Sequence, residues 1–599
     1  MPSRLITRMF VVLSFCAVAL AAAAQGFHLG PHVQNVTKDG ATIIWETKDE
    51  MPGEVAFGVD GQFAQKASEA QPATIHRVRL SGLQPDTTYA YRIKAGTEEK
   101  TASFKTAPAS ERPIVFAFIG DSRRWDQRWQ ETHMTESLLG HGIEFLVDNG
   151  DLVLNGHDKS LWPEHFERFA GLMEKLMVIS GRGNHEGART LDTGNDWFAK
   201  YHELPGKGEP FSVFDWGNTH FVLVSMDAVA GSAEELDADL GANKHKYTVV
   251  LFHQPVYCAG YLLPDNSRYE NGKSLANIAR VLEKHGVPLV LAGHTHIYER
   301  VLPLRDDHRD DRNGTAYIVQ GGDINANYPD WWTAFSDDKE TMDMPTYTVV
   351  ACNEDGIDLS TFVWGKQEKK IIEADHVILR ADERKAAELL ASLPGLSGDA
   401  LLKAIETLGA MLHQPAAKAL LSYLDKPETQ LAAARALRSI SDAGVAESLL
   451  PYLAKAEPAA RRELARAIEI AMPDSMAKPI AKIAKDASQD EIVRVKLIGA
   501  LQIHAPGVAR ETSAEILKQN APMEVRQRAA YALSRTATKD DVRMMAKLFD
   551  KEPDRFAMLS LAYGLNTLTG KKVSIDSKQP IGKSEPGKRG EYVKKWLAE

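Results

Sequence analysis

The sequence predicts a multidomain protein with an all-β sandwich, then an α/β domain, then an all-α solenoid. Three observations predict this order. Aromatic and β-branched runs separated by turn residues fill residues 27–108, and apolar runs alternate with helical stretches over 112–380. From residue 383 to 599, glycine becomes sparse and an Ala- and Leu-rich helical period begins. A chain of 599 residues is also too long for a single hydrophobic core.

Residues 1–24 have the pattern of a signal peptide. Arg4 and Arg8 give a positive start, residues 9–21 are apolar, and residues 22–24 are alanines suited to cleavage. The alternative is a retained membrane anchor, but the apolar run is short for a spanning helix. No other stretch of the sequence is long and apolar enough to cross a bilayer. We expect an exported mature chain without a transmembrane segment, in the periplasm or outside the cell.

The composition argues against one class of partner and does not decide whether the cysteines form a disulfide. The hydrophobic fraction of 44% and the charged fraction of 25% are typical of globular proteins. A formal net charge of −10 gives no basic surface for nucleic acid. Of three cysteines, Cys16 leaves with the signal peptide. Cys258 and Cys352 either pair in an oxidising compartment or stay separate buried thiols.

Residues 27–108 read as short strands between turns. Residues 41–47, 78–80 and 89–93 are rich in β-branched and aromatic side chains. Residues 83–91 (Leu-Gln-Pro-Asp-Thr-Thr-Tyr-Ala-Tyr) resemble the tyrosine corner of a fibronectin type III-like sandwich. The opening Gly-Pro-His-Val-Gln at 30–34 resembles the N-terminal domain of plant-type purple acid phosphatases. We expect a structural role for this sandwich.

Five apolar runs of the α/β region each lead into residues that bind metals. The runs are 114–119, 145–147, 176–179, 248–252 and 289–292, and they lead to Gly120-Asp121, Gly150-Asp151, Gly183-Asn184-His185-Glu186, His253 and Gly293-His294-Thr295-His296. Such runs are typical of buried strands, and open α/β sheets bind ligands beyond the carboxyl ends of their strands. Two Asp, one Asn and three His therefore meet at one edge. This donor set suits two metal ions, which together can attack a phosphate ester.

The order of these motifs resembles the calcineurin-like metallophosphoesterases. The longer strings at 253–257 (His-Gln-Pro-Val-Tyr) and 293–300 (Gly-His-Thr-His-Ile-Tyr-Glu-Arg) resemble the purple acid phosphatase branch. The resemblance covers roughly residues 113–365. It implies two sheets packed face to face and flanked by helices, which gives four layers.

The resemblance also implies a role for each motif residue. Asp151 would bridge two ions of iron, zinc or manganese. Asp121 and His296 would complete the first site, and the second would contain Asn184, His253 and His294. His185 would contact the phosphate and protonate the leaving group, a task that suits an imidazole. Glu186 would orient the ligands rather than bind metal.

The chain departs from these relatives beside the first metal. Many metallophosphoesterases have His two residues after the first Asp, where this chain has Arg123. Purple acid phosphatases have Tyr three residues after the second Asp, where this chain has Leu154. Arg has no lone pair to donate. Asn155 or water would then fill the position. Arg123 either grips the substrate phosphate or pairs with a nearby carboxylate. Without the tyrosinate, we expect a colourless or pale protein.

The implied activity is hydrolysis of phosphate esters by attack of a metal-bound hydroxide, with phosphomonoesters favoured. Arg123, His185 and Tyr257 would contact the substrate. The ligand set does not separate monoesters from phosphodiesters or nucleotides, so diester or nucleotide hydrolysis is the first alternative. The second is a catalytically weak binding or assembly protein, since the sandwich and the solenoid are both interaction modules.

Histidines off the motif positions are poor candidates for metal ligands. We expect surface or packing roles for His133, His141, His157, His165, His202 and His245. His220 lies in a strand-like run, and we expect it in the core.

The last third of the chain has an internal period. Pro427, Pro458, Asp490, Pro522 and Pro553 each precede a helical stretch, in steps of 31 or 32 residues. A step of this size fits a pair of helices with two turns, and such pairs must stack to bury their apolar faces. The array resembles HEAT repeats, although their usual step is ~40 residues. We expect a polar loop at 571–588, a last helix at 592–597, and a protein partner bound by the repeats.

Overall fold

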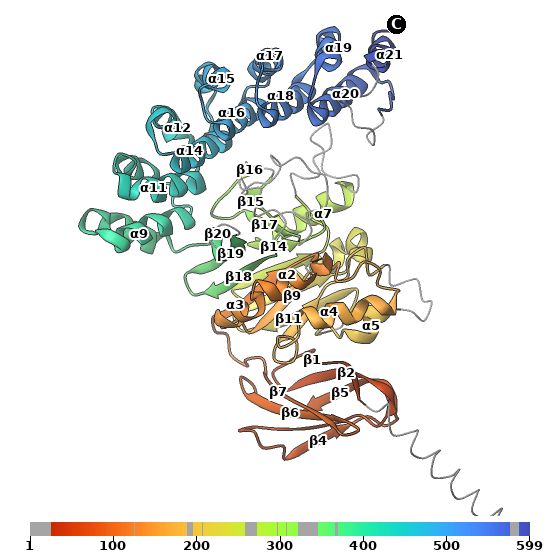
Figure 1. Cartoon of the computed structure of the whole chain (residues 1–599). Helices are drawn as coiled ribbons and strands as arrows, with labels where there is room; N and C mark the ends of the chain where they lie inside the picture. Colours follow the sequence, from red (N-terminus) through yellow and green to blue (C-terminus); the bar gives the residue numbers. More distant parts are fainter. Residues whose placement is uncertain are drawn as a thin grey trace, which may run out of the picture. The chain divides into compact units, whose positions relative to one another are not determined.

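The computed structural model describes residues 26–598, except residues 125, 188–195, 207, 258–271, 296–297, 307, 322–344, 366–368 and 576–585. The predicted signal peptide, Cys258 and His296 lie outside the described residues. Two compact units make up the chain, one rich in strands that extends to Arg380 and a helical one built from Ala381 onward (Figure 1). Within the described residues, no helix has the length and apolarity needed to cross a membrane.

The N-terminal region is a sandwich of two antiparallel sheets, as predicted. One sheet has the strand order β1–β2–β5, and the other has β4–β3–β6–β7. The strands are β1 Phe27–Gln34, β2 Gly40–Met51, β3 Glu54–Gly58, β4 Gln65–Ser68, β5 Ala73–Ser81, β6 Thr88–Ala95 and β7 Glu98–Lys105. In β6 the buried residues Tyr89, Tyr91 and Ile93 alternate with more exposed ones, as the period of two requires. The Tyr89 hydroxyl accepts the N–H of Gln84 at 2.9 Å, at the predicted tyrosine corner.

The α/β region contains two mixed sheets. The six-stranded sheet has the order β10–β9–β8–β18–β19–β20, and the seven-stranded sheet has β11–β12–β13–β14–β17–β15–β16. The strands of the first are β8 Ile114–Ile119, β9 Phe145–Asp148, β10 Met177–Ser180, β18 Thr346–Asn353, β19 Gly356–Gly365 and β20 Lys370–Leu379. Those of the second are β11 Phe211–Trp216, β12 Thr219–Val224, β13 Tyr247–Phe252, β14 Leu289–Ala292, β15 Tyr298–Arg305, β16 His308–Arg309 and β17 Thr315–Gln320.

The five predicted runs are β8, β9, β10, β13 and β14, so two sheets share them. The inner faces of the sheets meet through aromatic rings, with Phe116 of β8 at 5.2 Å from Phe221 of β12. Helices cover the outer faces through two separate apolar clusters. These helices are α2 Asp126–Glu131, α3 Met134–Gly140, α4 Trp162–Arg168 and α5 Trp197–Tyr201 on one sheet, and α6 Ala233–Ala242 and α7 Gly272–Lys284 on the other. The result is the predicted four-layer arrangement.

The sandwich packs against the α/β region through β1 and β6. Gln34 donates to the carbonyl oxygen of Val178 at 3.0 Å, and the Tyr91 hydroxyl donates to that of Glu174 at 2.8 Å. Three fully buried histidines lie at this contact. The ring centroid of His202 is 6.4 Å from that of His32 and 5.7 Å from that of His165. His165 and His202 are therefore packing residues, as expected from the sequence.

These buried imidazoles are short of hydrogen-bond partners. Among the described residues, neither ring nitrogen of His165 or His202 has a partner, and His32 makes a single bond, from Nε2 to the carbonyl oxygen of Tyr201 at 2.7 Å. Burial lowers the pKa of His32 to about 4 and holds the pKa values of His165 and His202 well below the usual range. All three imidazoles are therefore neutral at pH 7.

We expect this contact to make the protein sensitive to acid. An unfolded histidine takes up its proton near pH 6.5, whereas the folded ones resist it, so the unfolded state binds more protons below that pH. The free energy of unfolding should then fall by about 1.4 kcal/mol per pH unit for each imidazole as the pH drops from about 6.5 toward 4. His165→Phe should make this dependence shallower in denaturant unfolding between pH 7.5 and 5. Exposed His308→Asn is the control, and an equal slope in wild type and His165→Phe would refute the assignment.

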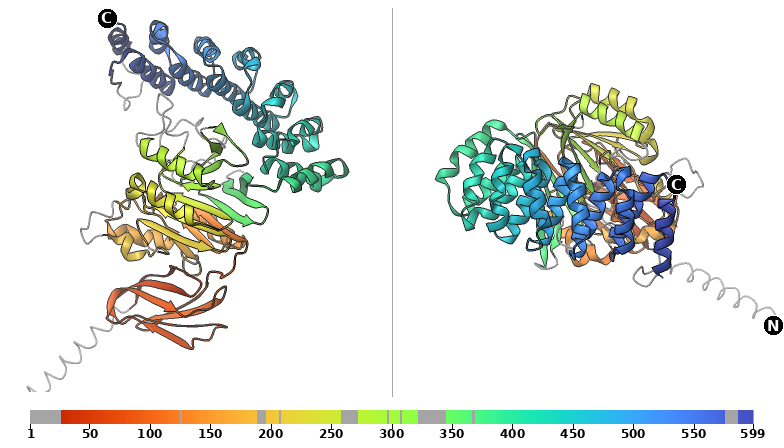
Figure 2. Two further views of the ribbon diagram at one scale, coloured as in Figure 1. Left: turned by 180° about the vertical axis from the view of Figure 1, so that it is seen from behind. Right: turned by 90° about the horizontal axis from the view of Figure 1, so that it is seen from above.

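The helical unit is a ladder of helix pairs (Figure 2). The helices α9, α11, α14, α16, α18 and α20 pack in succession, each against the next. The helices are α8 Glu383–Ser392, α9 Gly398–Ala410, α10 Ala416–Leu420, α11 Pro427–Ile440, α12 Ala443–Leu449, α13 Tyr452–Lys455, α14 Pro458–Ala471, α15 Ala477–Lys485, α16 Glu491–His504, α17 Pro506–Leu517, α18 Met523–Thr536, α19 Val542–Lys551, α20 Arg555–Thr569 and α21 Pro586–Leu597. The fold is the predicted all-α stack, and its HEAT-like type stays a prediction.

The sequence period coincides with the helix starts. Pro427 and Pro458 are the first residues of α11 and α14, where a missing N–H costs nothing. Asp490 caps α16 by accepting the N–H groups of Ile492 and Val493. The last helix, α21, begins at Pro586, earlier than the predicted residue 592.

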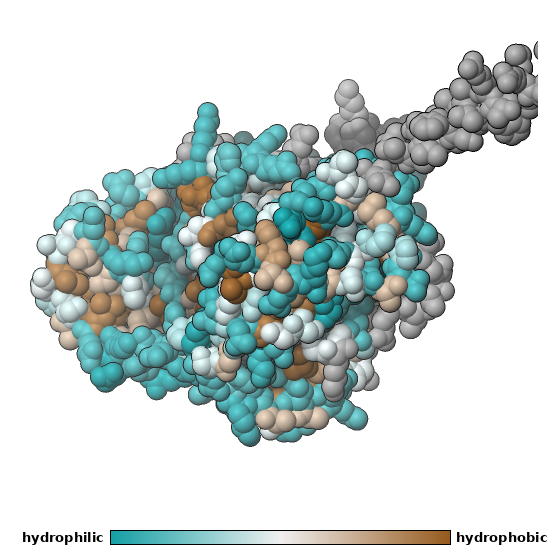
Figure 3. Space-filling model, turned by 90° about the horizontal axis from the view of Figure 1, so that it is seen from below, coloured by the Kyte–Doolittle hydropathy of each residue, from teal (hydrophilic) through white to brown (hydrophobic). Residues whose placement is uncertain are grey.

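Polar side chains dominate one face of the molecule, which Figure 3 shows with hydrophobic residues only in small separate groups.

Cys352 lies beneath the surface in β18 as a free thiol, and burial raises its pKa to about 12. Its predicted alternative partner, Cys258, lies outside the described residues.

Candidate metal centre

Unusual backbone conformations bring two acidic side chains and one imidazole together in one site. Asp121, Asp151 and His294 have φ values of 54°, 58° and 73°, which L-residues rarely adopt. Each follows a glycine just beyond the end of a strand. A Cβ on Gly150 would lie 2.7 Å from the backbone nitrogen of Gly183, so only glycine fits there. Such strained positions are typical of functional sites.

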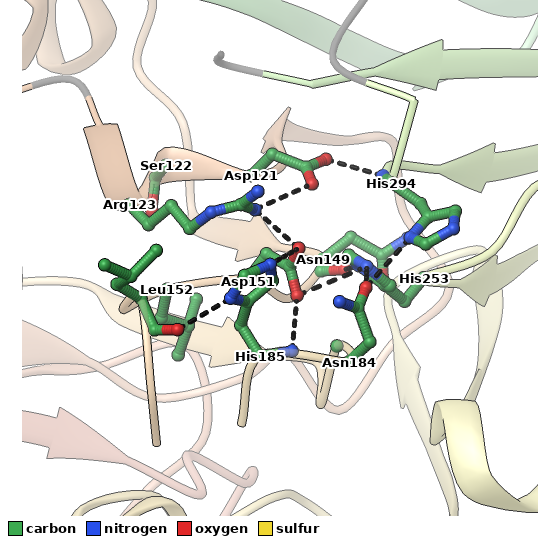
Figure 4. A network of polar contacts seen from close by, with 12 residues as sticks. Asp121, Ser122, Arg123, Asn149, Asp151, Leu152, Asn184, His185, His253 and His294 are labelled. Carbon is green, nitrogen blue, oxygen red and sulfur yellow. Dashed lines mark hydrogen bonds and ion pairs between the residues drawn. The ribbon is translucent and has the colours of Figure 1, made fainter. Parts of the chain in front are cut away.

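Asp151, His253 and His294 form a cluster of metal-ligand type. One ligand atom from each lies within 4.8 Å of the others (Figure 4). His253 Nε2 is 3.4 Å from Asp151 Oδ1 and 3.3 Å from Asn184 Oδ1. His294 Nδ1 is 2.9 Å from the same Asn184 oxygen. This mixture of imidazole nitrogen and hard oxygen fits a divalent transition ion.

A hydrogen bond orients the His253 ring for binding. Its Nδ1 lies 2.8 Å from the carbonyl oxygen of Asn149, which can only accept, so Nδ1 carries the proton and the lone pair is on Nε2. The Asn149 side chain donates to the carbonyl oxygens of Phe252 and Leu291 and so ties β9 to β13 and β14. The sequence reasoning missed Asn149, although its place directly before the Gly-Asp motif was a usable signal.

Asp121 completes the acidic side of the site. It is fully buried, and its Oδ2 accepts the backbone N–H of His294 at 2.6 Å. Burial and the nearby charge of Asp151 raise the pKa of Asp121 well above its usual value. Burial also acts to raise the pKa of Asp151, but the charges of His253 and Arg123 outweigh it, so that pKa lies below its usual value. Two close carboxylates of this kind attract positive charge.

Glu186 supports the site through the backbone. Its Oε2 accepts the N–H groups of Asp151 at 2.8 Å and Gly183 at 2.9 Å, and its Oε1 accepts that of Leu152 at 2.8 Å. Burial, with Asp151 adding to it, raises the pKa of Glu186 to about 7. Its oxygens are occupied by backbone donors, which is the orienting arrangement expected from the sequence.

Arg123 lies against the two acidic residues. Its Nη1 is 2.5 Å from Asp151 Oδ2 and 3.5 Å from Asp121 Oδ1, and its side chain is only 5% exposed. The observed contacts are those of the carboxylate pair, one of the two alternatives that the sequence left open. The guanidinium nevertheless lies at the carboxylate oxygens of the cluster, within the site.

His185 is held at the edge of the cluster. Its Nδ1 lies 2.7 Å from the carbonyl oxygen of Leu154, which fixes the proton on Nδ1, and its Nε2 is 3.8 Å from Asp151 Oδ2. Its side chain is 26% exposed. A partly exposed ring that is anchored at one nitrogen is suited to proton transfer at the other.

The other predicted positions are less central. His296 lies outside the described residues. The Tyr257 ring packs 4.8 Å from that of Tyr317 in the apolar cluster beneath α6 and α7. Asn155 Oδ1 accepts the N–H of His157 at 3.2 Å, as part of a local turn.

Comparison with known families agrees with this architecture. Residues 114–298 match the family model of the calcineurin-like phosphoesterases, and residues 28–106 match that of the purple acid phosphatase N-terminal domain. Purple acid phosphatase 21 of Arabidopsis thaliana is 28% identical over 321 residues, which cover 48% of this chain and 70% of the relative. Purple acid phosphatase 22 of the same plant is 27% identical over 301 residues, which cover 45% and 66%.

Among solved structures, that of a purple acid phosphatase from yellow lupin seeds superposes with a TM-score of 0.47 and 18% identity, over 58% of this chain and 74% of that one. The two family models match regions that end before the helical unit begins.

Proposed function

We propose that this chain, a metal-dependent phosphoesterase with a purple acid phosphatase N-terminal domain, hydrolyses phosphomonoesters at the Asp151 cluster. The observation that carries the proposal is the convergence of Asp151, His253 and His294 within 4.8 Å beside Asp121 and Asn184. A metal site that also contains a buried positive group, here Arg123, favours the doubly charged phosphate of a monoester.

Two ions are the cofactors, with iron, zinc and manganese as the candidates. Asp121, Asp151, Asn184, His253, His294 and His296 are the residues that would hold them. When bound, the ions activate water as the nucleophile and stabilise the attacking and leaving oxygens. Glu186 fixes the backbone from which Asp151 extends, and Asn149 fixes the His253 ring.

His185 is proposed to act as the imidazolium, which gives its Nε2 proton to the leaving group and becomes the neutral ring with its proton on Nδ1. Its Nδ1–H is tied to Leu154, so the Nε2 edge faces the site. Arg123 is proposed to bind the phosphate as well, since its charged guanidinium lies at the carboxylates of Asp151 and Asp121 within the cluster. Tyr257 is kept as a proposed substrate contact because of its position four residues after His253, although its ring packs against Tyr317.

Arg123→Ala separates this proposal from a purely structural ion pair. Loss of a charge-assisted hydrogen bond to phosphate should raise KM about 10- to 100-fold. Metal content should stay at the wild-type level. Arg123→Lys should recover part of the loss, because a point charge replaces the fork. Unchanged KM together with lost metal would instead assign Arg123 to carboxylate pairing alone.

Paired substrates test the ester preference. The mature protein, loaded with each candidate metal, is given a chromogenic phosphomonoester and the matching diester. A higher kcat/KM for the monoester supports the proposal. A higher value for the diester would assign the site to phosphodiester or nucleotide hydrolysis, and no turnover of either would favour a binding or assembly protein.

Export and a protein partner are further parts of the proposal. The positive start and apolar run of residues 1–24 support export to the periplasm or medium, which fractionation of cells expressing the full chain would test. The stacked helices from α9 to α20 support a role of the helical unit in binding a protein.

A further inference from the structure

A second group of metal-ligating side chains lies away from the Asp151 cluster. Asp215, His220 and His245 each offer a ligand atom within 4.8 Å of the others. Asp215 of β11 and His220 of β12 are direct cross-strand partners in an antiparallel hairpin. Their side chains therefore stand on the same face and next to each other. His220 Nδ1 is 2.7 Å from Asp215 Oδ1, and His245 Nδ1 is 3.6 Å from that oxygen.

A second carboxylate orients the buried imidazole. His220 Nε2 is 2.8 Å from Asp239 Oδ2, on helix α6. With Nε2–H donated to Asp239, the Nδ1 atom of His220 faces Asp215 and His245. Metal-binding histidines in proteins commonly donate their other nitrogen to a carboxylate in this way.

Asn243 supplies a fourth donor beside the group. It is the C-cap residue of α6, and its amide donates to Thr248 Oγ1 at 2.8 Å. This bond directs Oδ1 toward His245, where it accepts the backbone N–H at 2.9 Å and lies 3.2 Å from Nδ1. The Asn243 oxygen thus lies next to the His245 nitrogen of the group.

We propose that Asp215, His220, Asn243 and His245 form a structural zinc site. Zn–N and Zn–O distances of about 2.0–2.1 Å place the corners of a tetrahedron ~3.3 Å apart. The separations of 3.6 Å and 3.2 Å already match such edges, and the 2.7 Å pair needs only to open slightly. The ion would join the β11–β12 hairpin to the end of α6.

The site is separate from the catalytic one. His220 is paired with Thr248 near the start of β13, whereas His253 follows the last residue of that strand. Five residues of extended chain, roughly 16 Å, separate the two levels of the sheet. The inference thus stands independently of the proposed phosphoesterase activity.

Zinc content per chain tests the inference. Wild type, His245→Ala and Asp215→Asn are equilibrated with excess zinc, dialysed and measured by mass spectrometry. The matched control is His285→Gln, because His285 also pairs with a carboxylate, Asp237 at 2.6 Å. Asp215 and His245 lie at least partly at the surface, so both variants should fold, and far-UV circular dichroism verifies this.

The expected result is one zinc fewer in His245→Ala and in Asp215→Asn than in wild type, with the control unchanged. Phosphoesterase turnover should be the same in all four proteins. Equal zinc content throughout would overturn the site and assign the group to a hydrogen-bonded imidazolium. A loss of zinc in the His285 control as well would overturn it too, because it would show unspecific surface binding.

Discussion

Asp151→Asn should lower phosphomonoester kcat/KM by more than about 100-fold. This loss is larger than the one expected when a residue that only supports a metal ligand is replaced. The substitution keeps the size of the side chain but removes its charge. Asp151 is the residue that contacts His253, Arg123 and the backbone N–H of His185 at once. Losing the charge weakens metal binding and removes the ion pair between Asp151 and Arg123, so the variant should also hold at least one ion fewer.

This prediction is tested by measuring the turnover and the metal content of the purified protein. Asp237→Asn is the control, since that carboxylate pairs with Lys284 at the surface. Wild-type turnover in Asp151→Asn, with folded protein, would place the reaction elsewhere in the chain.

His185→Ala should also have a large effect, a fall in kcat of about 100- to 10,000-fold. The fall should depend on the leaving group, because a good leaving group departs without a proton. Aryl esters with acidic phenols should lose little, and alkyl esters should lose most. The partly exposed ring, anchored through Nδ1 to Leu154, gives the geometric reason.

A series of esters with graded leaving-group pKa values measures this dependence. Exposed His308→Asn should behave as wild type across the series. An equal loss for every ester would show that the His185 side chain supports the site in some other way than by protonating the leaving group, because the backbone N–H that Asp151 accepts is still present in the alanine variant.

The apolar runs predicted the strands closely because buried parallel strands are apolar on both faces. The run 114–119 is β8 and the run 289–292 is β14, residue for residue. The regular steps between helix starts predicted the helical stack, because proline and aspartate mark where a helix begins.

Other features depend on tertiary contacts that no local pattern contains. The five runs belong to two different sheets. Only strand pairings such as β8 with β18 and β12 with β13 decide which run joins which sheet. The partner of Arg123 depends on the positive φ angles of Asp121 and Asp151. His220 is buried as expected, but hairpin register and α6 bring two carboxylates to it. The three imidazoles around His202 come from positions far apart in the chain.

The most direct test of the central claim is phosphomonoester turnover by metal-stripped protein as iron, zinc or manganese is returned. The His245→Ala variant is the one to use, so that the proposed zinc site near β12 takes no part in the count. We expect no turnover in the stripped protein and recovery that levels off near two ions per chain. Turnover that is independent of metal, or none with any metal in a folded protein, would contradict it.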